Sequence, residues 1–407
     1  MSSASTSTST SSLSSSQSRK SPPTFQSLLE LHPLILSYLK SISPLTLLPL
    51  SKELYEELLP QIYSSITLNR SNARKLFIGY TPLTPSWAYR NKRSRYLHDQ
   101  PLHGRRSRSS PPDVASPTAP SADTSRKSHA LSLTRKVVLE DAESLSIICE
   151  VHRELLSYSP VQGSIELGRR RTIDHSDTSS PEDGGIPWPL SKVEVLEVGS
   201  ELIEYLVDCH APAENRGRGR ERLPICCIPF QPQSLIVHLP QLGGESAGTG
   251  RKYLRQAIAE LAGEFELDKL VLRIHVPLRS STREGNLAES DEGEIYIPPV
   301  ESPLPARRMV IILEPKIHPG TSKGEALYED DQRYSIATVN FLEDTGRRTL
   351  NLPDIQIVLP SKLRSSTERE VRQRLDGDGF GGYPQSVGKR VLDKTVFTDL
   401  QTAKREF

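Results

Sequence analysis

The feature that most restricts the fold of this chain is a leucine-rich segment at residues 24–68. Pro33 and Pro44 each stand where a helix can begin, because the proline ring fixes φ at a helical value and its missing N–H would have no partner in the first turn. Ser51 is a favourable N-cap for a third helix with an apolar stripe. Residues 66–68 favour a strand. The segment therefore predicts three short helices followed by a strand.

A unit of this size cannot cover its own leucines. Segments of about 45 residues are too small to bury so many apolar side chains by themselves. The third helix adds Leu54 and Leu58 to the apolar surface before Pro60 interrupts its period. One face must therefore be covered by a following domain or by another protein, and each leucine so buried would contribute about 1.5–3 kcal/mol.

This segment resembles the F-box-like domain of fungal proteins, over roughly a tenth of the chain. The matching positions are Glu30 and residues 35–39, 45–51 and 60–68, the last of which is similar to the "lYrsI.L" ending of the family. Ser27 and Leu28 stand where the family usually has Leu-Pro, and the tryptophans of many members are absent.

The resemblance implies a partner and a surface. It implies that the helices bind a Skp1-like adaptor of a ubiquitin ligase, while another part of the chain binds a client protein. The alternative is a helical subdomain that packs only against the rest of this chain. The residues that the resemblance assigns to the adaptor contact are Leu31, Pro33, Leu34, Ile35, Leu39, Leu45, Leu48 and Leu50.

Composition limits the remaining possibilities. Hydrophobic residues make up 35% of the 407 residues, below the usual globular share, so we expect the core to be concentrated in a few segments. A net charge of +1 gives no overall attraction to nucleic acid or to an acidic membrane. Four cysteines give no disulfide framework, which favours a cytoplasmic or nuclear location. No apolar run is long enough to span a bilayer, and the start lacks the apolar region of a secretory signal.

Shifts in composition divide the chain into five parts. We expect a disordered Ser/Thr-rich tail, an F-box-like helical domain, a basic Pro/Ser-rich linker, an α/β repeat-like domain and a C-terminal tail, at residues 1–23, 24–80, 81–129, 130–376 and 377–407. In the linker, Trp87, Tyr89 and Tyr96 alternate with arginines and lysines. This pattern fits a solvated loop or a patch for nuclear import or nucleic acid, and the absence of a recognisable nucleic-acid fold around it favours the loop.

The fold class that we predict is α/β, with a mostly parallel sheet after the helical unit. Short β-branched segments bounded by Pro, Gly or charge predict strands at residues 136–139, 193–198, 235–239, 270–275, 310–313 and 355–359. Helical patterns occupy residues 142–156, 200–209, 252–265 and 367–375. An order in which helices follow strands is typical of parallel sheets.

Three of these strands share the spacing L-x-x-L-x-L, which resembles the core of leucine-rich repeats. The three motifs begin at Leu190, Leu267 and Leu352. In the first motif, we expect Val193, Val195 and Val198 to point inward. The intervals between them are longer than those of leucine-rich repeats, and long polar inserts would account for the difference. A degenerate leucine-rich-repeat solenoid and an open α/β sheet with long loops both fit this pattern.

One motif suggests an enzyme. Ser246 lies in a G-x-S-x-G sequence between a strand and a helix, which resembles the nucleophile elbow of serine esterases. The acid and base of such a triad would be Asp291 with His318, or Asp268 with His275. Four residues separate the strand from the motif, and no HGG-type oxyanion loop precedes it. A serine hydrolase is therefore kept as the alternative function, and a non-enzymatic scaffold as a third possibility.

Cofactor and metal motifs are incomplete. The glycine-rich loop at residues 243–252 has Thr249 where a phosphate-binding loop needs lysine. Cys209 and His210, with Cys226 and Cys227, offer metal-binding atoms but lack a C-x-x-C hook. We therefore predict an interaction protein that is not an enzyme, with no cofactor and no metal: an F-box-like substrate receptor or adaptor that links a client protein to a ubiquitin ligase.

Overall fold

The computed structural model describes residues 25–77, 122–157, 189–211, 228–240, 247–277, 295–299, 306–316, 332–349, 351–376 and 385–404. The chain divides into two compact units, Met1–Ile62 and Tyr63–Phe407, and each is considered by itself.

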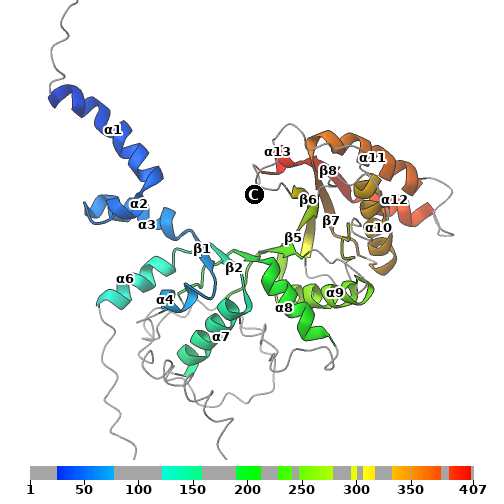
Figure 1. Cartoon of the computed structure of the whole chain (residues 1–407), viewed down its shortest axis with the longest axis horizontal. Helices are drawn as coiled ribbons and strands as arrows, with labels where there is room; N and C mark the ends of the chain where they lie inside the picture. Colours follow the sequence, from blue (N-terminus) through cyan, green and yellow to red (C-terminus); the bar gives the residue numbers. More distant parts are fainter. Residues whose placement is uncertain are drawn as a thin grey trace, which may run out of the picture. The chain divides into compact units, whose positions relative to one another are not determined.

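The first unit is helical. Its helices are α1 (Phe25–Ile42), α2 (Pro44–Leu47) and α3 (Lys52–Tyr63) (Figure 1). Helix α2 begins at its proline, and the hydroxyl of Ser51 accepts a hydrogen bond from the backbone N–H of Leu54 at 3.1 Å. Both helix starts agree with the signals in the sequence.

Two expectations about prolines in this unit are wrong. Helix α1 begins at Phe25 and runs through Pro33, and α3 continues past Pro60 to Tyr63. A proline inside a helix removes one backbone hydrogen bond and favours a kink, but the bonds on either side remain. Pro60 lies in the last turn of α3, and the helix ends three residues later at Tyr63.

The second unit is built on a parallel sheet of eight strands among the described residues, and the strands lie side by side in chain order. They are β1 (Ser65–Leu68), β2 (Lys136–Leu139), β3 (Val195–Val198), β4 (Ser234–Leu239), β5 (Leu267–Pro277), β6 (Ala306–Lys316), β7 (Asp354–Leu359) and β8 (Thr395–Asp399). The helices of this unit are α4 (Ala73–Phe77), α6 (Ala122–Leu131), α7 (Ala142–Ser157), α8 (Ser200–His210), α9 (Ala247–Gly263), α10 (Gln332–Arg348), α11 (Ser361–Asp376), α12 (Gln385–Asp393) and α13 (Leu400–Ala403).

This strand order has a functional consequence. In doubly wound α/β folds, the strand order reverses at one point, and ligands bind in the crevice at that reversal. The described sheet runs from β1 to β8 without a reversal, so it has no crevice of that kind.

The predicted α/β class and the six predicted strands in the α/β region are confirmed, although β5 and β6 are each 11 residues long and extend well beyond their predicted bounds. The sheet also includes two strands that lie outside the 130–376 region assigned to it from the sequence. Strand β1 pairs with β2, and β8 pairs with β7 although it lies within the segment assigned to the C-terminal tail. Helices α4, α6, α10, α12 and α13 were not predicted, and α6 begins within the segment assigned as linker.

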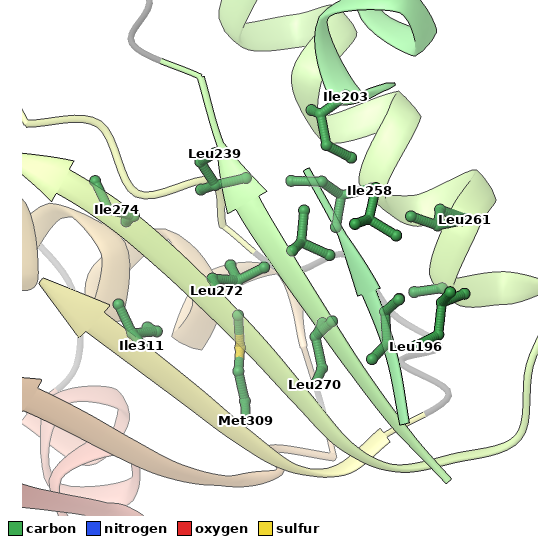
Figure 2. Packing of buried hydrophobic residues seen from close by; sticks show 14 of the residues in the cluster. Leu196, Ile203, Leu239, Ile258, Leu261, Leu270, Leu272, Ile274, Met309 and Ile311 are labelled. Carbon is green, nitrogen blue, oxygen red and sulfur yellow. The ribbon is translucent and has the colours of Figure 1, made fainter. Parts of the chain in front are cut away.

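Alternate strand residues and the helices from α7 to α12 form one continuous core. In Figure 2, Leu239, Leu272 and Met309 lie in the neighbouring strands β4, β5 and β6. Ile203 of α8 and Ile258 of α9 belong to the same core. Leu270 lies in register between Leu235 and Met309, so one apolar row crosses β4, β5 and β6. All six helices therefore cover the same face of the sheet.

The apolar spacing recurs in five consecutive strands, β4 to β8. Buried or half-buried residues at 232, 267, 306, 352 and 392 each stand at or shortly before the start of a strand whose alternate side chains enter the core. The inward positions predicted after Leu267 and Leu352 are confirmed. In β3, however, Leu196 and Val198 point inward and Val195 lies on the opposite face, so the predicted register was wrong by one residue at that position.

Candidate functional site

The helical unit exposes several large apolar side chains on α1, α2 and the turn after α2. Their exposed fractions run from 38% to 67%. Those on α1 begin with Leu34 and continue one, four, five and eight residues after it, which places them on one side of the helix. This surface, called the apolar helix face below, consists of Leu34, Ile35, Tyr38, Leu39, Ile42, Leu45 and Leu50.

Other side chains of α1 and α3 connect the two helices. The ammonium of Lys40 lies 2.6 Å from the carboxylate of Glu57, so this side of α1 is turned toward α3. Leu47, Leu58 and Leu59 are buried. The apolar helix face is therefore surface that remains after these helices have folded.

Most residues assigned to adaptor contact from the sequence lie on the apolar helix face. Leu48 is half-buried, and the side chains of Leu31 and Pro33 lie outside the described part of the chain. Tyr38 and Ile42 belong to the face but were missed, although each lies four residues after another exposed apolar residue of α1.

The sheet presents a second candidate surface on the face opposite α7–α12, called the open face below. A row of polar side chains crosses it from β2 to β6. Lys136 Nζ lies 2.5 Å from Glu197 Oε2, and Glu197 Oε1 accepts a hydrogen bond from His238 Nε2 at 2.7 Å. The rings of His238 and His275 stack with centroids 6.0 Å apart, and His275 Nδ1 lies 4.0 Å from Glu314 Oε2. We call these five residues the polar row.

The open face also holds an apolar patch. It comprises Ile236, Val271, Val310, Ile312 and Val358, together with Ala403 of α13. The short helix α13 therefore packs on the side of the sheet opposite the other helices. Beyond the patch, Arg308 donates a hydrogen bond to Gln356 at 2.5 Å, and Gln356 donates to Thr398 at 3.1 Å, which extends the polar contacts to β8.

Glu197 has the strongest electrostatic perturbation on this face. The hydrogen bond from His238 is the main cause that lowers the pKa of Glu197 to about 2, and Lys136 lowers it further. Burial acts in the opposite direction, because the side chain is only 11% exposed. The folded chain therefore holds Glu197 as a carboxylate, fixed between a cation and an imidazole.

This perturbation predicts a pH-dependent loss of stability. Because folding lowers the pKa of Glu197 from 4.5 to about 2, its contribution to the free energy of unfolding is present above pH 4.5 and lost as the pH falls through 2. Replacing Glu197 with Gln should lower the free energy of unfolding at pH 7 by up to about 3 kcal/mol, and by less than half as much at pH 3.

Urea unfolding of both proteins at pH 7, 5 and 3 measures this difference. Glu194→Gln is the matched control, because Glu194 pairs with Arg135 at 2.6 Å at the exposed surface, where ion pairs contribute little. A difference between wild type and Glu197→Gln that does not change with pH would contradict the assignment.

A third feature is a cavity of about 290 Å³ on the helix side of the sheet, between α9, α10 and residues 295–299. Arg251 lies over the ring of Tyr296, 4.9 Å from its centroid, and burial raises the pKa of Tyr296. Arg347 and Glu343, which also line the cavity, pair at 3.2 Å. The cavity is at the lower end of ligand-site volumes, and its charges of both signs leave no clear ligand preference.

The candidate catalytic residues do not come together in the described chain. Ser246, Asp291 and His318 lie outside it. Asp268 and His275 are seven residues apart in one extended strand, β5, which separates them by about 23 Å. That pair therefore cannot serve as the acid and base of one triad.

Of the candidate metal ligands, the structure describes two. Cys209 is buried in α8, and His210 Nε2 lies 2.8 Å from Glu260. Cys226 and Cys227 lie outside the described residues. Within the described ranges, no three His, Cys, Asp or Glu side chains are grouped so that they could hold a metal ion.

The length and hydropathy of the described helices do not reach what a bilayer span requires. Comparison of the chain with models of known families, with curated proteins and with solved structures finds no match.

Proposed function

We propose that this chain is an F-box-like substrate receptor, in which the apolar helix face binds a Skp1-like adaptor and the α/β unit binds a client protein. The observation that carries the proposal is the exposure of seven large apolar side chains on one short helical unit. So many exposed large apolar side chains on so short a unit are uncommon on soluble proteins unless they belong to an interaction site.

The energy available from this face is sufficient for a stable complex. Full burial of one Leu or Ile side chain contributes about 1.5–3 kcal/mol. Leu34, Leu45 and Leu50 are each about two-thirds exposed, so a partner could bury most of their surface. Such a gain must still exceed the loss of translational and side-chain freedom on association, which is why several exposed residues are needed.

The α/β unit supports a client-binding role. Its strands lie in chain order, all parallel, with a recurring apolar spacing, and in this respect it resembles a degenerate leucine-rich-repeat solenoid. Arrays of this kind present one face of a continuous sheet to a partner. Here that face would be the open face with its polar row.

The proposal assigns no chemical step to this chain, since ubiquitin transfer would be carried out by other subunits of the ligase. A fluorophosphonate probe, which labels activated serines, separates this from the hydrolase alternative. Labelling that disappears in Ser246→Ala would overturn the proposal.

Affinity purification of the full chain from its own cell type is the direct test. We expect an adaptor and a cullin among the retained proteins, and a complex of the purified chain with the adaptor that survives gel filtration. Retention of other partners without an adaptor would instead support a scaffold whose helical unit is purely structural.

A further inference from the structure

Arg273 lies on the open face of β5, next to the polar row, and no carboxylate among the described residues pairs with it. It is in register with His238 of β4 on one side and with Ile312 of β6 on the other, and His275 follows it on the same face of β5. Its Nε is buried and makes no hydrogen bond, and among the described residues no carboxylate pairs with its guanidinium. A half-buried cation thus stands between an imidazole and an aliphatic side chain.

An arginine in this setting favours an external anion. Burying a charge without a partner costs free energy, and a bound carboxylate or phosphate would recover that cost. The planar guanidinium can donate two parallel hydrogen bonds to either group. Glu197 and Glu314 contact the neighbouring imidazoles, so neither of these carboxylates already neutralises Arg273.

We propose that Arg273, flanked by His238 and His275, binds a single anionic side chain of the client polypeptide, either an acidic residue or a phosphorylated one. The identification of the ligand as part of a client protein rests on the proposed function. The surroundings favour a peptide with apolar neighbours beside its anion, because buried Val271 and Ile312 adjoin the arginine.

The same surroundings disfavour nucleic acid. A nucleic-acid strand carries a phosphate at every nucleotide and is bound by surfaces with many cations. Here Glu197 lies on one side of Arg273 and Glu314 on the other, within the polar row. One isolated anion fits between them, whereas a run of phosphates would meet these carboxylates.

Three degenerate peptide libraries test the proposal. They share apolar flanks and differ only in a fixed central residue, which is Ser, Glu or phosphoserine. Binding is measured by fluorescence anisotropy to the full chain without adaptor, so that failure here leaves the adaptor proposal untouched. We expect at least one anionic library to bind ten-fold or more tightly than the serine library, and the comparison of Glu with phosphoserine identifies the anion.

Variants of Arg273 test whether this arginine causes the preference for an anionic residue. Arg273→Gln should abolish the preference, whereas Arg307→Gln, which removes an arginine that is 89% exposed on the neighbouring strand, should retain it. Arg273→Lys keeps the charge but loses the two-pronged geometry, so it should weaken the preference several-fold, and it provides the comparison if Arg273→Gln does not fold. Equal binding of all three libraries, or a preference unchanged in both Arg273 variants, would overturn the proposal. Tighter binding of a single-stranded oligonucleotide that is lost in Arg273→Gln would overturn the assignment of a peptide ligand.

Discussion

Replacing Leu34 and Leu45 together with glutamate is expected to lower the affinity for the adaptor by at least 100-fold without lowering the melting temperature of the chain. The two side chains are 67% and 64% exposed, so the folded chain gains little from them. In the complex each would lose about 1.5–3 kcal/mol of apolar burial, and every 1.4 kcal/mol is a ten-fold change in affinity. Isothermal titration of the purified adaptor measures the effect.

The matched control introduces the same two charges elsewhere on the same helices. Ser37 and Thr46 are exposed but do not belong to the apolar helix face, so Ser37→Glu with Thr46→Glu should change the affinity by less than three-fold. Leu48 is unsuitable for this test because it is half-buried, and a glutamate there would also disturb folding. Adaptor binding that survives in the Leu34 and Leu45 variant would show that the contact surface lies elsewhere.

The strands of the α/β unit were predictable because their signals are local. Each predicted strand alternates inward apolar residues with residues of the other face, as in Leu235, Val237 and Leu239 of β4. Alternation is a property of a few neighbouring residues, so it can be read without knowing what the strand contacts. The alternation of strands and helices along the chain then predicted a parallel sheet.

The missed elements lack such local signals. Helix α10 buries Ser335, Thr338 and Thr345 alongside its apolar residues, so its buried face does not read as a hydrophobic stripe. Strand β8 turns Thr395 and Phe397 inward and leaves Val396 exposed, which gives it a weak apolar pattern. Packing against α11, α12 and β7 determines these elements, and that information is distant in the sequence.

The candidate sites also combine features that the sequence indicates locally with features that depend on distant packing. Leucines in residues 24–68 indicated apolar surface, but their order along the chain could not separate exposed Leu34 from buried Leu58, because that depends on how the helices pack. Glu197, His238 and His275 come from three strands, and only the cross-strand register brings them together. No spacing within one segment predicts such a row.

Replacing Gly388 with alanine is expected to lower the free energy of unfolding by about 3 kcal/mol, the upper end of the range for overpacked positions. Gly388 lies in α12, where an added Cβ would collide with the backbone carbonyl oxygen of Leu375 in α11. A backbone atom cannot rotate away, so α12 would have to move. Arg390, which donates to the carbonyl of Gly346 at 2.9 Å, would then lose its position at the end of α10.

Two other helical glycines show whether the cost of an added Cβ depends on what it meets. At Gly346 an added Cβ would meet the Val391 side chain at 2.6 Å, and a side chain can partly adjust, so Gly346→Ala should cost less than Gly388→Ala. At Gly263 nothing lies within 4 Å, and alanine there should be neutral or stabilising by up to about 1 kcal/mol. Urea unfolding gives the three free energies, and hydrogen exchange should quicken in α12 and β8 for Gly388→Ala. Equal effects at all three positions would mean that the close approach of α12 to α11 contributes nothing to the stability of the sheet's last strand.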